Sequence, residues 1–251
     1  MANFVENYLA NVISLLQAIE SESQAAIQEA AIAVADAIAD GGLFILFGSG
    51  HSALIAKDAA YRAGGLAPVL AIDDVADGDA ERIEGIAKYL VSRYDLRAGS
   101  VMAVISNSGI NPVPIEMAQI AKAGGLKVIA ITSVAHGQAV ASRHSSGKKL
   151  FDVADIVIDT HGAPGDASVA LPGSDYKVGA TSTIAGSAIV QAITVQAAGL
   201  LAERGIQPPI WVSANVPGGD ANNNALLERY RPFLARYQMA TLPAFLGLGH
   251  K

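Results

Sequence analysis

The 251-residue chain contains no cysteine, and charged residues make up only 16% of it. Without cysteine, neither a disulfide framework nor a thiolate zinc site can form. Basic residues are also scarce, because 17 Lys and Arg stand against 23 Asp and Glu, which leaves a net charge of -6. A broad nucleic-acid surface requires a basic stripe. We therefore expect no nucleic-acid partner.

Clear signals for export or membrane insertion are missing as well. The first 17 residues include Glu6 and lack a basic start followed by an unbroken apolar run, so they do not resemble a secretion signal. The stretch 178–202 carries no charge and reaches the roughly 20 residues that a bilayer span needs. Ser, Thr and Gln side chains interrupt it, however, and these are satisfied more easily inside a protein core. We predict a buried helix, no membrane contact and a cytoplasmic protein.

Apolar residues are abundant, at 51% of the chain, and many are Ala, Ile and Val. Such a composition suits helices packed over a sheet that is buried on both faces, and helix surfaces shared with another subunit. We expect one domain over 1–251 and an oligomer. Within that domain we expect N-terminal helices at 1–40, a core at 41–204 and a C-terminal extension at 205–251.

The spacing of apolar residues changes along the chain from helical to strand-like. It predicts two amphipathic helices over 4–20 and 21–40, and a last one over 225–237. Between them, helical segments separate five short apolar runs, at 43–47, 68–72, 101–105, 127–132 and 154–159. Continuous apolar strands alternating with helices predict an α/β fold with a doubly wound parallel sheet. Ligands of such folds bind beyond the carboxyl ends of the strands.

Small polar residues occupy three predicted helix starts, at 48–52, 106–109 and 181–183. Helix N-termini offer unpaired N–H groups and a positive dipole end, and small side chains let an anion approach them. Pro112 and Pro114 remove two amide donors from the second start. Anion binding there would depend on its serines, on Asn111 and on the N–H groups of Gly109 and Ile110. The candidate ligand-binding residues are Gly48, Ser49, Gly50, Ser52, Ser106, Asn107, Ser108, Gly109, Asn111, Thr181, Ser182 and Thr183.

The same loops allow other interpretations. Residues 48–53 also spell Gly-x-Gly-x-x-Ala, a dinucleotide fingerprint, and Asp73 and Asp74 follow the second strand where a ribose-binding acid would lie. An NAD-dependent dehydrogenase is therefore one alternative. Ordinary capping of a helix that starts with proline is a second explanation for the serines and Asn111.

The strings GSGHS at 48–52, SNSG at 106–109 and TSTIAG at 181–186 resemble the sugar isomerase (SIS) domain, over roughly residues 35–205. The longer strings SNSGINPVPIEMA, SRHSSGKKL and NVPGGD resemble a group of SIS proteins labelled phosphoheptose isomerases. The resemblance implies a flavodoxin-like, three-layer sandwich with a five-stranded parallel sheet. It also implies a homodimer or homotetramer with composite sites, and a phosphorylated sugar as ligand. Its phosphate would be bound by Ser49, Ser52, Ser106, Ser108 and Thr183.

Aldose–ketose isomerisation needs an acid that opens the sugar ring and a base that moves a proton between adjacent carbons. His51 lies in the first loop and suits such a role, although a His that caps a helix start is an equal interpretation. In related isomerases an acid on the next helix often transfers the proton, and the carboxylate there is Asp58. Glu84, before the third strand, is the other catalytic candidate, although a solvated helix face explains it as well.

The last long helix leaves the question of turnover open. The family's isomerases often carry a His or Glu inside it, whereas this chain offers only Gln191 and Gln196. A base from a neighbouring subunit is one solution. We therefore consider a sugar-phosphate isomerase first and a phosphosugar sensor without turnover second.

Other polar residues are candidates for sugar contacts. Residues 136–149 gather positive charge that suits either a cationic lid over an anionic sugar or a solvated loop. No spacing of His and carboxylates indicates a metal site, and we expect no cofactor. The residues concerned are Arg143, His144, Lys148 and Lys149 in that stretch, His161, Asp166 and Lys177 around the next loop, and Asp220 in the extension.

Overall fold

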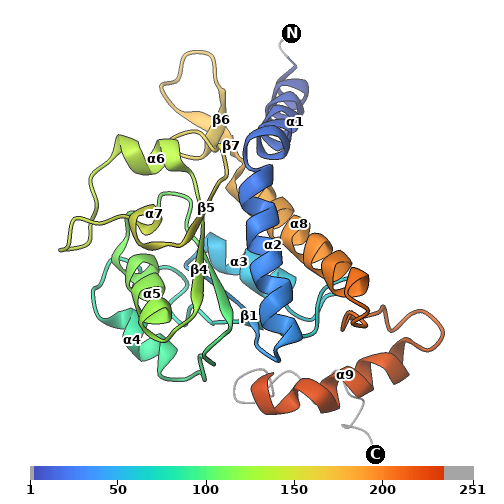
Figure 1. The fold of residues 1–251 in the computed structure, drawn as a ribbon. Coiled ribbons are helices and arrows are strands. Elements are labelled where there is room, and N and C mark those ends of the chain that lie inside the picture. Colours follow the sequence, from blue (N-terminus) through green and yellow to red (C-terminus); the bar gives the residue numbers. More distant parts are fainter. Residues whose placement is uncertain (1–2, 235–251) are drawn as a thin grey trace, which may run out of the picture.

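Two long helices form the N-terminal part of the fold. The computed structural model describes residues 3–234. Helix α1 spans Phe4–Glu22 and α2 spans Gln24–Ala39, as the apolar spacing predicts. Helix α2 buries eight residues in the core, whereas α1 buries only Ile19. Most of α1 therefore extends beyond the body of the molecule (Figure 1).

The central sheet has five parallel strands in the order β2-β1-β3-β4-β5, which confirms the predicted sheet. Strands β1 and β3 begin and end at the same height in the sheet, because Phe44 pairs with Val101 and Gly48 pairs with Ile105. The strand order reverses at β1, and ligands bind at such a switch point. The strands are β1 (Phe44–Gly48), β2 (Val69–Ala71), β3 (Val101–Ile105), β4 (Lys127–Thr132) and β5 (Ile156–Asp159).

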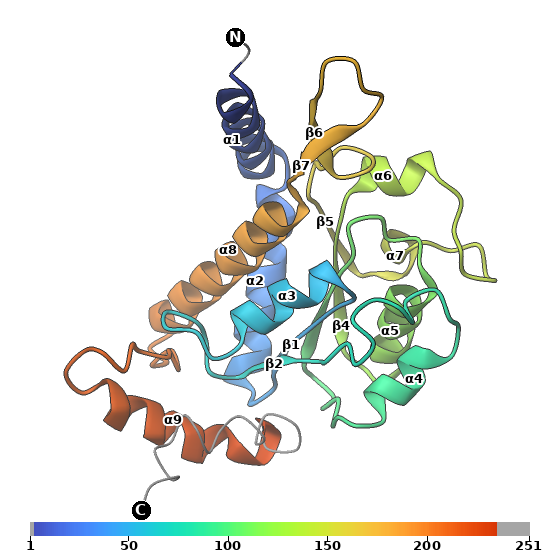
Figure 2. The ribbon, with the colours of Figure 1, turned by 180° about the vertical axis from the view of Figure 1, so that it is seen from behind.

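Helices cover both faces of the sheet and complete a three-layer sandwich (Figures 1 and 2). Successive strand residues point to opposite faces, so Phe44 packs against α2, α3 and α8 while Ile45 packs on the side of α4, α5 and α7. This confirms the predicted α/β class. The helices are α3 (His51–Ala59), α4 (Ile86–Val91), α5 (Pro112–Ala123), α6 (Val134–Ala139), α7 (Leu150–Val153) and α8 (Ser182–Glu203).

Helix α8 is the long apolar helix of the core. Within residues 3–234 it is the one helix whose length and composition would allow it to cross a membrane. Its buried side chains, among them Ile189, Val190 and Ile193, belong to the core cluster that also contains α2 and α3 residues. This packing accounts for the apolar composition of the uncharged stretch.

Two additions to the sandwich lie outside the predicted strands. A small antiparallel sheet of β6 (Ala167–Ala170) and β7 (Lys177–Ala180) lies beside α1, where the Tyr8 hydroxyl donates to the Ala180 oxygen at 2.8 Å. In the C-terminal extension, Trp211 stacks on Tyr61 with ring centroids 5.2 Å apart. Helix α9 (Gly219–Leu234) begins earlier than predicted, and the predicted continuation to 237 lies outside the described residues.

Candidate functional site

A cavity of about 540 Å³ lies at the carboxyl ends of the strands, beside the switch point between β1 and β3. The loops after β1 and β3 and the start of α8 line it, so the structure brings the three hydroxyl-rich segments together. The lining residues are Ser49, Gly50, His51, Ser52, Asp77, Gly78, Glu81, Ser106, Asn107, Ser108, Asn111, His136, Asp166, Ala180, Ser182 and Thr183.

The loop after β1 is fixed by close packing and by one buried carboxylate. A Cβ atom at Gly48 would lie 2.5 Å from the backbone of Ser52, so only glycine fits there. Gly50 has a positive φ of 55°, and its N–H donates to Oδ2 of Asp74 at 2.8 Å. Helix α3 then begins at His51 without a side-chain cap. Its N-terminal end is therefore open to a ligand.

The loop after β3 is tied to the end of β4. The Gly109 N–H donates to the Ser106 Oγ at 3.2 Å, and the Asn107 carbonyl accepts from the Ser133 N–H at 2.9 Å. Gly109 has a φ of 63°, and a Cβ atom there would lie 2.8 Å from the Thr132 hydroxyl, so glycine is required. The loop thus presents its serines from a rigid turn.

Asn111 and Arg143 connect this loop to the stretch 136–149. The Asn111 amide oxygen accepts a hydrogen bond from the Arg143 guanidinium at 2.8 Å, and the Arg143 N–H donates to the Ile110 carbonyl at 2.9 Å. Asn111 immediately precedes Pro112, the first residue of α5, but makes no side-chain cap. The Asn111 side chain therefore holds the Arg143 guanidinium at the edge of the cavity.

Three polar atoms in the lining residues are buried without a hydrogen-bond partner: Ser49 Oγ, Asn107 Oδ1 and His136 Nδ1. Among the residues that the structure describes, the remaining atom of this kind is the Tyr61 hydroxyl. A buried polar group left unpaired costs about 1–3 kcal/mol. Their concentration around one cavity indicates a site that a polar ligand completes.

The start of α8 is already occupied by a carboxylate of the protein. Asp166 accepts from the Ser182 N–H at 2.8 Å, the Ser182 hydroxyl at 2.6 Å and the Thr181 N–H at 3.1 Å. Thr181 is buried and does not line the cavity, whereas Ser182 and Thr183 do. An anion at this end of the cavity would have to displace the Asp166 carboxylate. In the loop after β1 the Gly50 N–H is likewise bonded to the Asp74 carboxylate, whereas the hydrogen bonds of Ser106 and Asn111 in the loop after β3 involve no carboxylate.

The three catalytic candidates lie in different places. His51 lines the cavity. Asp58 lies farther along α3, outside the lining, and forms an ion pair with Arg62. Glu84 also lies outside it and accepts hydrogen bonds from the N–H and the hydroxyl of Ser145, at 2.6 and 2.9 Å. These bonds hold the pKa of the Glu84 carboxyl below its ordinary value.

Besides Asp77, Glu81 is a lining carboxylate that the sequence did not single out. Its carbonyl accepts from the Val113 N–H at 3.1 Å, which fixes this part of the chain against α5. Desolvation raises the pKa of the Glu81 carboxyl above its ordinary value, against the opposing effects of Arg82 and Arg143. A carboxyl with a raised pKa in a cleft suits proton transfer. From the sequence we chose Glu84 of the same segment, ERIEG at 81–85, whereas in the structure Glu81 lines the cavity and Glu84 does not.

The geometry weighs against a dinucleotide at the first loop. Asp74 is buried and accepts the Gly50 N–H, so its carboxylate supports the loop from behind. Asp73 forms an ion pair with Lys57 at 3.7 Å. Neither residue lines the cavity, so neither is placed to accept a ribose hydroxyl there.

The remaining polar candidates are distributed around the fold. Arg143 contacts Asn111 at the rim, whereas Lys149 Nζ donates to the Gly137 carbonyl at 2.5 Å. Asp166 lines the cavity, while Lys177 in β7 and Asp220 in α9 are exposed and lie outside the lining. His161 Nε2 lies 3.0 Å from the Ser23 hydroxyl on the α2 side.

Comparisons with known proteins agree with this geometry. The SIS domain family matches residues 7–133. The UPF0309 protein of Shouchella clausii is 41% identical over 239 residues, which cover 91% of this chain and 97% of the relative. Phosphoheptose isomerase GmhA from Neisseria gonorrhoeae has a TM-score of 0.54 at 20% identity, over 78% of this chain and 97% of that chain. The Vibrio vulnificus NanR protein complexed with ManNAc-6P has a TM-score of 0.51 at 16% identity, over 94% of this chain and 71% of that chain.

These likenesses carry different weight. The two solved structures are distant in sequence and show a shared fold. The family match and the curated relative show common ancestry, and they confirm the resemblance that GSGHS, SNSG and TSTIAG indicated. The chain belongs to the SIS domain family.

Proposed function

We propose that the protein binds a phosphorylated sugar in the cavity and interconverts its aldose and ketose forms. The observation that carries the proposal is the set of unpaired buried polar atoms, led by Ser49 Oγ and Asn107 Oδ1, in loops that end at the switch point of the sheet. A ligand rich in hydroxyl and phosphate oxygens supplies the hydrogen bonds that these atoms lack.

In this proposal the phosphate is bound by neutral donors. The hydroxyls of Ser49, Ser106 and Ser108 and the N-terminal end of α3 surround one end of the cavity, and none of the described lining residues is Lys or Arg. Small hydroxyl side chains and a helix N-terminus form a common phosphate site. Because Asp166 occupies the donors at the start of α8, the proposal places the phosphate at the loops after β1 and β3.

The sugar carbons then face the groups that can move protons. Glu81 acts as the base that removes a proton from the carbon next to the carbonyl and returns it to the neighbouring carbon, with an enediolate between the two steps. Its raised pKa makes the carboxylate a stronger base than an ordinary glutamate. His51, in the same cavity, protonates the ring oxygen as the ring opens.

A sensor without turnover is the second candidate. Helix α8 contributes Ser182 and Thr183 to the lining, whereas Gln191 and Gln196 lie outside it. The family likeness does not decide between the two, because one neighbour in fold is named a phosphoheptose isomerase and another is a NanR protein complexed with ManNAc-6P.

A ligand screen by thermal shift tests the binding site. Sugar phosphates of five to seven carbons and amino-sugar phosphates are compared with NAD and NADP, on the wild type and on Ser106→Ala and Ser108→Ala. A ligand that binds the folded state raises the apparent melting temperature by mass action. We expect a sugar phosphate to stabilise the wild type and both variants to lose most of that shift. Ser92→Ala, an exposed serine outside the cavity, serves as the matched control.

The outcomes separate the candidates. Stabilisation by NAD alone, unchanged in the serine variants, would overturn the phosphosugar site. Binding of a sugar phosphate without conversion, when the mixture is followed by NMR, would support the sensor. Conversion between aldose and ketose forms establishes the isomerase.

We also propose a homo-oligomer that works in the cytoplasm. Helix α1 presents Val5, Leu9 and Ile13 at a spacing of four residues, and their exposed fractions are 70%, 52% and 56%. A stripe of this kind on a projecting helix is typical of an interface. We expect Leu9→Lys to lower the mass measured by light scattering to that of one chain, whereas Glu20→Gln leaves it unchanged. A wild type that is already monomeric would contradict the proposal.

A further inference from the structure

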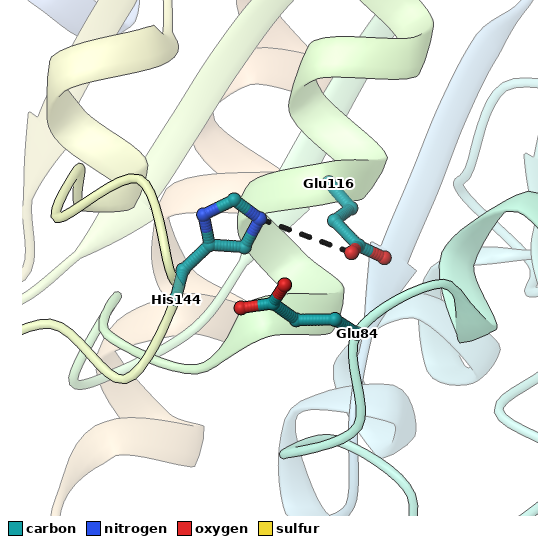
Figure 3. A group of neighbouring side chains, drawn as sticks. All are labelled: Glu84, Glu116 and His144. Carbon is teal, nitrogen blue, oxygen red and sulfur yellow. Dashed lines mark ion pairs between the residues drawn. The ribbon is translucent and has the colours of Figure 1, made fainter.

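Three ionisable side chains from separate segments meet outside the cavity. Glu84 precedes α4, Glu116 lies on α5, and His144 lies in the loop before α7. One ligand atom of each lies within 4.8 Å of the others. Figure 3 shows the imidazole and the two carboxylates turned towards one another. Two oxygen donors and one nitrogen donor therefore surround a single point.

The cluster holds more negative than positive charge. The side chains of Glu116 and His144 are only 15% and 10% exposed. Neither glutamate forms an ion pair with a Lys or Arg within residues 3–234. His144 Nε2 lies 3.8 Å from Glu116 Oε1, and in the same described part of the chain it makes no hydrogen bond. Two carboxylates held beside a nearly buried ring nitrogen lack the cation that would neutralise them.

Hydrogen bonds hold all three groups in place. The Gly85 N–H reaches both Glu116 oxygens, at 2.8 and 2.9 Å, and Ser145 donates to both Glu84 oxygens. A carboxylate has about four lone-pair positions, so each oxygen can still bind a cation. His144 Nδ1 lies 2.7 Å from the Ser146 hydroxyl. Nδ1 also accepts from the Ser146 N–H at 3.1 Å, so binding of an ion at Nε2 shifts the ring proton to Nδ1, where the Ser146 hydroxyl can accept it.

We propose that Glu84, Glu116 and His144 bind a divalent transition-metal ion of the Zn²⁺ class. An imidazole nitrogen beside carboxylate oxygens suits Zn²⁺ and neighbouring ions, whereas Mg²⁺ and Ca²⁺ prefer oxygen ligands alone. Ligand atoms around a tetrahedral Zn²⁺ lie about 3.4 Å apart, given bonds of about 2.1 Å. Closing the cluster to that distance requires the exposed Glu84 side chain to rotate away from Ser145, and His144 Nε2 and Glu116 Oε1 to approach each other from 3.8 Å. Water completes the coordination.

The ion lies outside the cavity and stabilises two segments that contribute to its edge. Glu84 is three residues beyond Glu81, which lines the cavity. His144 follows Arg143, whose guanidinium is bonded to the lining residue Asn111. Joining Glu84 and His144 to α5 therefore fixes two segments that carry cavity groups. The proposed role is structural and does not depend on the identity of the sugar.

Metal titration of the full-length protein tests the site. The chain is treated with a chelator, dialysed and titrated with Zn²⁺ by calorimetry, and with Co²⁺ by visible absorption, which reports the coordination geometry. We expect one ion per chain. His144→Asn and Glu116→Gln should weaken binding at least about a hundredfold, and Ser146→Ala, which alters the outer partner, about tenfold. Zn²⁺ should also raise the melting temperature of the wild type and of none of the ligand variants.

His161→Asn is the matched control, because His161 also lies beside two carboxylates, those of Glu22 and Asp159, at 4.0 and 3.9 Å. Circular dichroism establishes that each variant is folded. Binding that disappears in His161→Asn and survives in His144→Asn would overturn the proposal. So would the absence of stoichiometric Zn²⁺ binding to a folded wild type, or Mg²⁺ displacing Co²⁺ at equal concentration.

Discussion

Glu81→Gln should lower kcat on the cognate sugar phosphate by about 10²–10⁴ while leaving the thermal shift that this ligand produces nearly unchanged. The amide keeps the size and hydrogen-bonding capacity of the side chain but cannot accept a proton from carbon. The measurement is turnover by NMR beside thermal-shift titration on the same preparations. Asp79→Asn, an exposed acid two residues away and outside the cavity lining, is the matched control.

The pH dependence provides an independent check on Glu81. Because desolvation raises the pKa of this carboxyl, the acidic limb of kcat/KM should lie above the ordinary range of glutamate. The folded state then binds more protons than the unfolded state between the ordinary pKa and the raised one, so ionisation of Glu81 reduces stability as pH rises through that window. Glu81→Gln should remove this decline and be relatively more stable at neutral pH. A variant with full turnover would exclude Glu81 as the base.

Gly48→Ala should destabilise the protein by about 1–3 kcal/mol and abolish most phosphosugar binding. The added Cβ would lie 2.5 Å from the Ser52 carbonyl and 2.8 Å from its Cβ, so the start of α3 would have to move away from β1. That movement displaces Ser49 and His51 from the cavity. Urea unfolding gives the stability change, and a titration with the stabilising sugar phosphate gives the loss of affinity.

Gly199→Ala is the control variant, because it replaces a glycine with alanine without creating a steric clash. Gly199 lies inside α8, and apart from adjacent residues and the backbone of its own helix no atom lies within 4 Å of the position that an alanine methyl group would take. Alanine should therefore stabilise the helix by about 0.5–1 kcal/mol. Phosphosugar binding should be unaffected. Equal losses of stability and affinity in Gly48→Ala and Gly199→Ala would show that the close contact with Ser52 is not the reason for glycine at position 48.

The sequence indicated the sheet and the loops more reliably than the individual acids. The runs at 101–105 and 127–132 coincide with β3 and β4, because a strand buried on both faces must be apolar throughout. Residues 49–52 and 106–108 of the loops GSGHS and SNSG line one cavity, since both loops follow neighbouring strands of one parallel sheet. The antiparallel pair β6 and β7 was not predicted, because its short strands lack a continuous apolar pattern.

Individual side chains depend on contacts between distant segments. Whether Glu81 or Glu84 reaches the cavity follows from the packing of their segment on α5, where Val113 binds the Glu81 carbonyl. Asp166 and Ser182 are 16 residues apart, and the pairing of β6 with β7, in which Ala167 lies opposite Ala180, brings the carboxylate onto that helix start. The proposed metal site likewise has no recognisable spacing along the chain. The packing of three distant segments brings together Glu84, Glu116 and His144.

By itself, the sequence determined the α/β class, the parallel strands and the hydroxyl-rich loops of this SIS domain, because periodicity and loop chemistry are local properties. The tertiary structure alone decided that Asp74 supports the first loop, that Asp166 occupies the start of α8 and that Glu81 faces the cavity. The reason is physical: the direction of a loop side chain is set by the long-range hydrogen bonds and packing that hold its backbone, and these exist only in the folded chain.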